Sequence, residues 1–382
     1  MQSRIRSIFI LFGLFTIVFG SGQAVGDSLR RLAASEIPEL QIDDSALGSE
    51  EAGSRELFEG SLTRQLSLCS SLTEVWEFAG ESVPKERWCR DTVMWFLGHL
   101  KGGLSLNELF AKAKSELQWF ESTGKPDTHE VQFTGYYFPV HRAKLMSDEV
   151  FKYPVYRTPS DLGRPYFTRA QIEDGGVLRG RGLEIAYLDN PVDPYILQVQ
   201  GSGALLFSTE DGGIRRQIVN YASENGRPYS SLGRAMRLAG IDEEFINLQG
   251  IKRYFTLIHP EAWSSFANQN ESYVFFKTDA EGPFGYSGAV LTPKHSIAVD
   301  RTIFPMGAVG LIQTERPDRV EGDQAITWKK FAQFVVAQDT GGAIRTPGRV
   351  DVFWGEGAYA EVAAGRTDRT GRLFFMLVPP KP

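Results

Sequence analysis

From residue 131 onward the chain is a series of short apolar runs, each closed by Gly, Pro or Asp. Apart from one helical stretch, these runs are typical of strands, and no parallel alternation of strand and helix is visible. Many short strands at roughly even spacing are typical of a β-barrel or a β-sandwich. The runs include EVQFTGYYFPV, GGVLRGRGLEIAYLDNP, YILQVQGSGALLF, ESYVFFK, AVLTPKHSIAVD, AVGLIQTE, FAQFVVAQD, VDVFWG and LFFMLVP.

Two stretches have helical character instead. Between residues 62 and 120, the segment SLNELFAKAKSELQWF has a Ser105–Glu108 capping box. Its apolar residues recur at helical spacing: Leu109, Phe110, Ala113, Leu117 and Phe120. A second helical stretch runs from residue 229 to 270, with a Ser-type cap at its start and Gly240 as a stop signal. We therefore expect a mainly β chain with helices near its N-terminus.

The first 26 residues have the order of a secretory signal peptide. Arg4 and Arg6 precede an apolar run over residues 8 to 19, and small residues follow, so cleavage after Ala24 or Gly26 is expected. An uncleaved anchor remains the alternative, although about 12 apolar residues are few for a membrane span. Since no cysteine follows the run, lipidation is not expected. Residues 27–58 are polar, acidic and serine-rich, and we expect a flexible lead-in.

Composition excludes some classes of function. A net charge of −6 argues against a nucleic-acid-binding protein. The two cysteines, Cys69 and Cys89, either form a disulfide in the exported chain or lie as buried thiols between helices. The five histidines show no zinc-ligand spacing, so we expect neither a metal nor a cofactor.

The segment VDVFWG places a carboxylate in a strand. Side chains alternate between faces, so Val350, Val352 and Trp354 point one way and Asp351 the other, between Arg349 and an aromatic ring. An aromatic neighbour makes the surroundings less polar, which suits a general acid. The alternative is a solvated or arginine-paired surface aspartate.

Two further aspartates end apolar strands. Asp339 is followed by Gly341 and Gly342, and Asp300 by the turn residues Pro305 and Gly307. Either residue alone is typical of a turn. Three such aspartates, each beside an apolar strand, indicate a converging set.

Two familiar hydrolase classes do not fit. Aspartic proteases need two DTG-type triplets whose carboxylates share a proton, and the chain has one, at Asp339. Ser202 in QGSGA lacks the GxSxG spacing of a serine hydrolase, and no histidine is clearly placed to activate it.

The three aspartate segments AVDRTIFPMG, AQDTGGAI and VDVFWGEG together resemble the membrane-bound lytic murein transglycosylase A family. The likeness covers about residues 130 to 357 and includes QFTGYYFPV, YPVYRTP, YILQVQGSG, YASENGRPY and NQNESYVFF. The loop between Asp339 and Asp351 is one residue longer than is usual in that family. The family's typical member is a lipoprotein, which the missing cysteine puts in question here.

The resemblance implies a fold of two barrels with a groove between them. The N-terminal helices and a double-psi β-barrel would comprise residues 59–138 and 273–382, and a second β-barrel would be inserted at 139–272. It also implies a lytic transglycosylase that cleaves peptidoglycan between N-acetylmuramic acid and N-acetylglucosamine and leaves 1,6-anhydromuramyl ends.

Carried over by motif, Asp351 matches the family's catalytic acid and base, and Asp339 and Asp300 match its companions. The resemblance places Thr134, Tyr137 and Gln200 in blocks that line the groove. The expected partner is the glycan strand itself, possible others are cell-wall synthesis or hydrolysis proteins, and the chain is expected to be a periplasmic monomer. A glycan-binding protein without catalysis is the alternative, because a fold alone does not fix a function.

Overall fold

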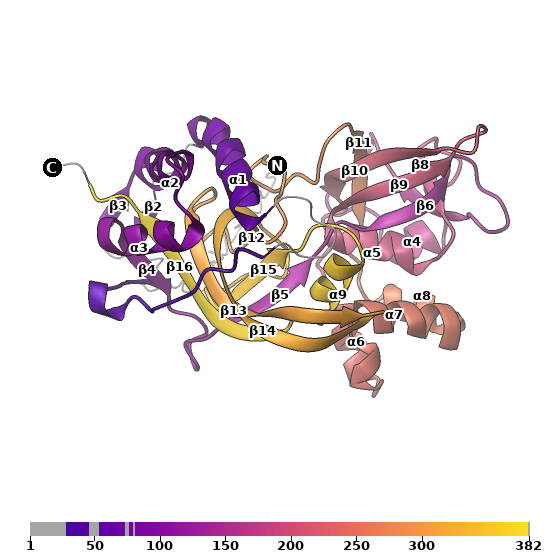
Figure 1. Cartoon of the computed structure of the whole chain (residues 1–382). Coiled ribbons are helices and arrows are strands. Elements are labelled where there is room, and N and C mark those ends of the chain that lie inside the picture. The colour runs from indigo at the N-terminus through magenta and orange to yellow at the C-terminus, as the bar shows by residue number, and fades with distance from the viewer. Residues whose placement is uncertain (1–27, 46–52, 73–75, 79–80, 381–382) are drawn as a thin grey trace, which may run out of the picture.

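The computed structural model describes residues 28–45, 53–72, 76–78 and 81–380 (Figure 1). The expected signal peptide lies outside these residues. The helices are α1 Ser54–Leu68, α2 Thr92–Lys101, α3 Leu106–Glu116, α4 Arg169–Glu173, α5 Val192–Gln200, α6 Leu232–Leu238, α7 Leu248–Arg253, α8 Trp263–Ala267 and α9 Ala358–Arg366.

The strands up to the second sheet are β1 Leu29–Arg31, β2 Trp76–Phe78, β3 Glu81–Val83, β4 Gln118–Ser122, β5 Val131–Tyr136, β6 Val140–Lys144, β7 Tyr153–Tyr156, β8 Glu184–Leu188, β9 Ser202–Ser208, β10 Ile214–Glu224 and β11 Val274–Asp279. The remaining strands are β12 Ser296–Ala298, β13 Val309–Glu321, β14 Gln324–Asp339, β15 Arg349–Phe353 and β16 Arg369–Leu377.

Six strands close into a barrel. The order β16-β13-β14-β12-β15-β5 returns to β16 through a β5–β16 pairing, and β4 and β1 extend the sheet beyond β16. Two pairs are parallel, β12 with β14 and β15 with β5, and the other ring pairs are antiparallel. Closure removes the exposed strand edges that an open sheet would leave. The expected fold class, mainly β with N-terminal helices and a β-barrel, is confirmed, and the structure shows that six strands form this barrel.

The barrel core follows from alternation along the strands. On β15, Val350 and Val352 are fully buried, and Trp354 just after the strand lies in the same core. Gly135 on β5 makes room for this indole, because a Cβ there would meet Trp354 Nε1 at 2.4 Å. Trp354 is therefore a core residue, which leaves the opposite face of β15 to Asp351.

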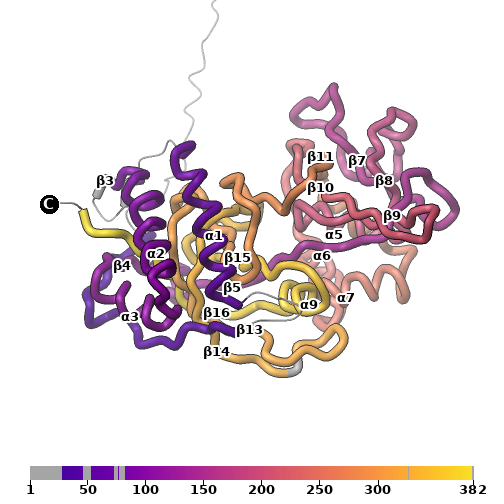
Figure 2. Tube along the Cα trace, turned by 45° about the horizontal axis from the view of Figure 1, so that its top comes forward, coloured from indigo at the N-terminus to yellow at the C-terminus, as the bar shows by residue number. Residues whose placement is uncertain are grey.

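A second sheet is built from residues between β5 and β12. Its order is β11-β10-β9-β6-β8-β7, and an isolated bridge between Arg157 and Phe276 links its two ends. Figures 1 and 2 show this sheet beside the barrel, with helices α1–α3 on the side of the barrel away from it. The chain passes from β5 of the barrel directly into β6 of the second sheet.

The N-terminal helices are fixed to the barrel near its aspartate loops. Cys69 and Cys89 form a disulfide with a Cα–Cα distance of 5.7 Å, as one of the two sequence interpretations proposed. Gly307 has a φ of 87° and packs against Gln65 of α1 and Cys89, where a Cβ would approach Gln65 Nε2 to 2.4 Å. The turn that follows Asp300 is thus held by the helices.

Some elements differ from the sequence prediction. YILQVQ was expected as a strand but forms the end of α5, which Gly201 terminates with a φ of 79°. Residues Val192 to Gln198 are all buried, and a segment buried all round shows no periodicity that separates helix from strand.

The helix over residues 105–120 ends earlier than its pattern predicts. The Ser105–Glu108 capping box is present, but α3 stops at Glu116. Phe120 lies in β4, which pairs with both β1 and β16. Sheet pairing on both sides overrides the helical spacing of the apolar residues.

The expected flexible lead-in also carries structure. β1 pairs with β4, and Leu29, Ile37 and Ile42 are buried against the barrel. Asp43 forms an ion pair of 2.7 Å with the buried Arg316 of β13. A few well-placed apolar residues and one ion pair are enough to dock this stretch, although its composition is polar.

Helices α6 to α8 occupy the expected second helical stretch. Ser231 is the N-cap of α6, and its side chain accepts a hydrogen bond from the Arg234 backbone. Gly240 follows α6 with a φ of 76°. Within the described residues, none of the helices has both the length and the apolar character needed to cross a membrane.

Candidate active site

Asp351 lies in the middle of β15, between two other strands of the barrel. It pairs with Thr134 of the parallel strand β5 on one side and with Ala298 of the antiparallel strand β12 on the other. Its side chain is 20% exposed. The barrel therefore fixes the position of this carboxylate from both sides, while some of it remains accessible.

Two side chains hold the Asp351 carboxylate. The Thr134 hydroxyl donates a hydrogen bond to Asp351 Oδ1, and Arg349 Nε lies 3.2 Å from the same oxygen. Arg349 Nη2 also donates to Thr134 Oγ1 at 3.0 Å. Arg349 thus contacts both members of the pair, and Asp351 Oδ2 has no partner among the described residues.

Asp339 is the second carboxylate of the site. It ends β14, and its Cα pairs across the sheet with Ala298, the residue that also pairs with Asp351. Its Oδ1 accepts hydrogen bonds from the backbone N–H groups of Thr340 at 2.9 Å and Tyr286 at 3.0 Å. Burial raises the pKa of Asp339, these hydrogen bonds oppose the rise, and the negative charge of Asp351 adds to it.

Tyr136 belongs to the same group. It lies two residues beyond Thr134 on β5, so both side chains are on one face of the strand. Its ring packs against Phe353 with a centroid distance of 5.2 Å. Burial raises its pKa well above the usual value, and the charges of Asp339 and Asp351 raise it further. Among the described residues, the buried hydroxyl makes no hydrogen bond of good geometry.

Asp300 has a different setting. Its side chain is buried, and its Oδ1 accepts hydrogen bonds from the Thr302 backbone at 3.0 Å and the Thr302 hydroxyl at 2.7 Å. Its carbonyl accepts from the backbones of Ile303 and Phe304. Asp300 thus fixes the turn after β12, next to the strand that separates Asp339 from Asp351.

The structure places the three residues expected to line the groove in different surroundings. Thr134 contacts Asp351 directly, whereas the Tyr137 side chain is buried in the core and lies near Glu361 and Asp193. Tyr137 contributes its backbone N–H, which donates to Gln200 Oε1 at 3.0 Å. Gln200 therefore joins the end of α5 to the end of β5. Tyr136, not Tyr137, faces the carboxylates.

Several site residues were not assigned a role from the sequence. Gln338, just before Asp339, is fully buried and accepts from Ser296 at 2.6 Å and Ser61 at 3.3 Å. Its amide donates to Gln65 of α1 at 3.2 Å. A polar residue in an otherwise apolar strand, VVAQD, is the one signal that pointed to this buried network.

Two loops meet over Asp339. Tyr286, whose N–H the Asp339 carboxylate accepts, is 56% exposed. The Arg301 guanidinium lies over the Tyr286 ring at 4.6 Å. From the second sheet side, Tyr229 is near enough to Arg349 and Asp351 for both charges to act on its pKa, which burial raises. The backbone of Tyr286 and the side chain of Tyr229 therefore both lie close to the carboxylates.

The donor set does not suit a metal. Within the described part of the chain, no group of three or more His, Cys, Asp or Glu side chains is arranged to hold an ion. Asp351 is paired with a guanidinium and Asp339 with backbone N–H groups. The arrangement is one of two carboxyl groups with separate partners, which suits proton transfer.

Two family descriptions match the chain. Residues 132–277 match the "MltA specific insert domain", and residues 295–377 match the "3D domain". The chain is 31% identical to membrane-bound lytic murein transglycosylase A of Vibrio cholerae over 295 residues, covering 72% of this chain and 78% of that protein. It is 33% identical to the protein of the same name from Escherichia coli over 264 residues, covering 68% and 69%.

Solved structures agree with these matches. The structure of membrane-bound lytic murein transglycosylase from Agrobacterium tumefaciens has a TM-score of 0.70 and 25% identity, covering 92% of this chain and 98% of that one. That of E. coli MltA with bound chitohexaose has a TM-score of 0.66 and 26% identity, covering 94% and 98%.

Proposed function

The chain belongs to the membrane-bound lytic murein transglycosylase A family, and from that premise we propose how its carboxylates act. It is a lyase that cleaves the glycan strands of peptidoglycan. In the proposed reaction, one carboxyl group serves first as the acid and then as the base.

In the first step, protonated Asp351 donates its proton to the oxygen that links N-acetylmuramic acid to N-acetylglucosamine, the bond from that oxygen to C1 of the muramic acid breaks, and the N-acetylglucosamine leaves as an alcohol. The half-buried setting and the Thr134 hydrogen bond support this role, because a general acid must be held in one orientation. The partner-free Oδ2 is the oxygen that faces the reaction. The 2-acetamido group of the muramic acid stabilises the positive charge that develops at C1.

In the second step, the Asp351 carboxylate takes a proton from the C6 hydroxyl of the same muramic acid, and that oxygen attacks C1. The C1–O6 bond forms as the proton leaves, so the product is a 1,6-anhydro ring and no water is added. Glycosidases that use water need a second carboxylate as base or nucleophile. Here the nucleophile is intramolecular, which can be worth ~7–11 kcal/mol.

Asp339 and Asp300 are positioning residues in this proposal. Asp339 binds the Tyr286 N–H and so fixes the exposed aromatic loop beside the site. Asp300 fixes the turn after β12 through Thr302. In this proposal Thr134 acts on the substrate groove through its hydrogen bond to Asp351, and Gln200 through its hydrogen bond to the backbone of Tyr137.

The single observation that carries the proposal is the Asp351–Thr134 pair on the adjacent parallel strands β15 and β5, with Asp339 on β14, across the intervening strand β12. The test is to incubate the purified protein with isolated sacculi and to measure the masses of the released fragments by mass spectrometry. Muropeptides one water lighter than hydrolysis products are expected. Fragments of hydrolytic mass would contradict the mechanism, and the absence of any release would favour a non-catalytic glycan binder.

The setting of the enzyme completes the proposal. We place it in the periplasm, exported by its N-terminal segment and associated with the outer membrane, as its membrane-bound relatives suggest. We also propose that it acts as a monomer on glycan strands, with cell-wall synthesis or hydrolysis proteins as possible recruiting partners.

A further inference from the structure

A cavity lies in the part of the chain that carries the second sheet, apart from the three aspartates. Its volume is about 490 Å³, within the range of small-molecule sites. Its lining is largely aromatic and proline: Tyr153, Tyr156, Tyr273, Trp263, Pro191 and Pro194. Neither Asp300, Asp339 nor Asp351 lines it.

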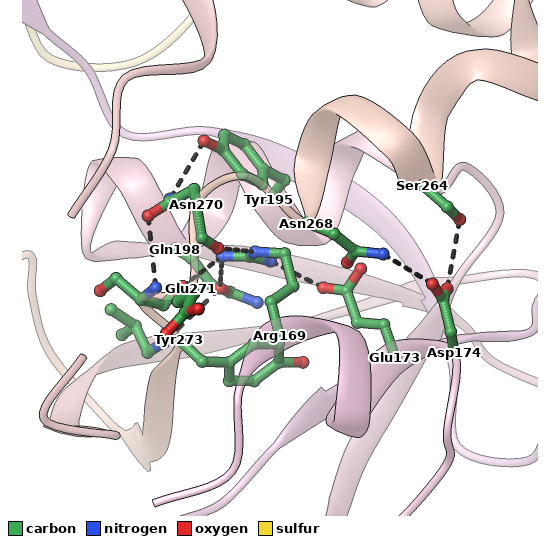
Figure 3. A network of polar contacts seen from close by, with 12 residues as sticks. Arg169, Glu173, Asp174, Tyr195, Gln198, Ser264, Asn268, Asn270, Glu271 and Tyr273 are labelled. Atoms are coloured by element: carbon green, nitrogen blue, oxygen red, sulfur yellow. Dashed lines mark hydrogen bonds and ion pairs between the residues drawn. The ribbon is translucent and has the colours of Figure 1, made fainter. Parts of the chain in front are cut away.

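A rigid support holds one carboxylate in this lining, as Figure 3 shows. The side chain of Arg169 is 1% exposed, and its Nη1 donates to Glu173 Oε1 at 2.7 Å. Its other N–H groups donate to Gln198 Oε1 and to the carbonyls of Asn270 and Ser272. With every side of the guanidinium satisfied, Glu173 is held in one orientation.

The Arg169 guanidinium also lies close to two aromatic rings. It lies 4.5 Å from the Tyr195 ring centroid and 5.0 Å from that of Tyr273. Tyr195 in turn contacts Trp263 edge to face at 5.5 Å. The support of Glu173 therefore includes two aromatic residues of the cavity wall, so the acid and the rings form one built unit.

Glu173 is the carboxylate that remains available there. Asp174, its neighbour, accepts hydrogen bonds from Ser264 at 3.2 Å and Asn268 at 2.6 Å (Figure 3). Glu173 Oε2, in contrast, has no partner among the described residues, and the Glu173 side chain is 26% exposed. Burial of this group raises its pKa, which a bound cation would offset.

Two cations line the same cavity. Lys152 and Arg179 are exposed, and Lys152 makes no ion pair within the described residues. Arg179 donates to the backbone carbonyl of Glu173 at 3.1 Å, which fixes its guanidinium to the end of α4. The cavity lining thus combines the Glu173 carboxylate, several aromatic rings and two exposed cations.

We propose that this cavity binds the peptide part of peptidoglycan, with a peptide ammonium group at Glu173 and a peptide carboxylate at Lys152. Aromatic rings beside a carboxylate suit an ammonium group, and an exposed lysine suits a carboxylate. The stem peptides of peptidoglycan carry both groups, whereas a peptide-free glycan strand carries no ammonium group. The choice of peptide rests on the proposed function, and the cavity would make the enzyme sensitive to peptide substitution of its substrate.

The test uses the free tetrapeptide L-Ala-γ-D-Glu-L-Lys-D-Ala as probe and isothermal titration calorimetry as readout. We expect the wild-type chain to bind it, Glu173→Gln to bind about tenfold more weakly and Lys152→Gln about fivefold more weakly. Glu210→Gln, an exposed acid of the same sheet region, is the matched control and should bind like wild type. Asp351→Asn should also bind like wild type, because the cavity does not include Asp351.

Glu173→Gln removes the negative charge that pairs with the buried Arg169, so the thermal midpoint of this variant is measured in parallel. Lys152 is exposed, and Lys152→Gln provides a variant whose fold is not at issue. Cleavage of peptide-free glycan strands separates the two proposals, and Lys152→Gln should leave that rate unchanged. If wild type cleaves these strands but does not bind the tetrapeptide, or if both variants bind it as tightly as wild type, the inference is wrong while the proposed function stands. Displacement of the tetrapeptide by chitohexaose in Asp351→Asn would also overturn it, because it would make the cavity a sugar site.

Discussion

Thr134 and Asp351 face each other across the parallel pair β5–β15, and the threonine hydroxyl donates to the carboxylate. The two residues are 217 positions apart in the chain. All residues of the second sheet lie between β5 and β12 in the sequence. Closure of the barrel therefore brings Thr134 and Asp351 together across this whole insertion. The site is therefore a property of the closed barrel, and its chemistry depends on how each partner holds the carboxyl group.

Replacing Thr134 by valine removes this hydrogen bond at nearly constant shape. We expect kcat on sacculi to fall about tenfold, the effect of ~1.4 kcal/mol, with little change in KM, because the contact orients the acid and not the sugar. Thr128→Val, at an exposed position, is the control. An unchanged kcat would show that Thr134 does not position Asp351.

Arg349 uses two different nitrogens to contact Asp351 and Thr134. A lysine carries the same charge but has no planar fork, so it cannot reproduce both contacts. We expect Arg349→Lys to lower kcat about five- to tenfold while the thermal midpoint stays close to wild type. Full activity in the lysine variant would mean that only the charge matters.

Ionised Asp339 should lower the free energy of unfolding at neutral pH. Its folded-state pKa is raised above 3.8, mainly by burial, so ionisation is less favourable in the folded chain than in the unfolded chain. The cost is absent below pH 3.8 and is complete above the raised pKa. Asp339→Asn keeps the Oδ1 acceptor for Tyr286 and Thr340, and we expect its thermal midpoint to be about 1–3 °C higher than wild type at pH 7.

This advantage should shrink as the pH is lowered towards 3.8, which differential scanning calorimetry at several pH values can follow. Activity should fall in the same variant, because a neutral amide oxygen accepts the Tyr286 N–H less strongly than a carboxylate oxygen does. A constant difference in thermal midpoint at all pH values would exclude the proposed ionisation effect.

His295 should make the barrel acid-sensitive. It is fully buried between Phe334 and Ser54, with Nδ1 2.7 Å from the Phe334 carbonyl and Nε2 3.0 Å from the Ser54 hydroxyl. Burial lowers its pKa from 6.5 to about 3, so the imidazole stays neutral in the folded chain while the unfolded chain takes up a proton. The stability from neutral His295 is present above pH 6.5 and is lost as the pH falls towards 3.

One such group changes the free energy of unfolding by up to ~1.4 kcal/mol per pH unit. Urea denaturation between pH 7 and pH 4 should therefore show a shallower pH dependence for His295→Gln than for wild type, even if the variant is less stable overall. Equal slopes for the two proteins would contradict this account.

The sequence predicted the strands that carry the site, because alternation survives in short segments. Val350 and Val352 marked the core face of β15, which left Asp351 on the other face, as the structure confirms. Alternation on β5 also distinguishes Tyr136 from Tyr137, but the register that decides which tyrosine faces the carboxylates depends on pairing with β15. That pairing is set by barrel closure, which no local pattern encodes.

Buried polar contacts were the part that could not be predicted. Gln338 is satisfied by Ser61 and Gln65 of α1, more than 270 residues away. Asp300 looked the same as Asp339 in sequence, since both end a strand before a turn. Only the structure shows that Asp300 binds its own turn through Thr302 while Asp339 binds the Tyr286 loop.

The most direct test of the central claim compares the products of wild type, Asp351→Asn and the exposed control Asp127→Asn on purified sacculi. Asparagine retains an acceptor for Thr134 but has no acidic proton that it could donate to the glycosidic oxygen. General acid–base catalysis typically contributes about 10²–10⁴-fold to the rate. Quantitative mass spectrometry should show anhydromuropeptide release reduced at least 100-fold in Asp351→Asn and unchanged in Asp127→Asn. Release of anhydromuropeptides by Asp351→Asn at the wild-type rate would show that another group transfers the proton.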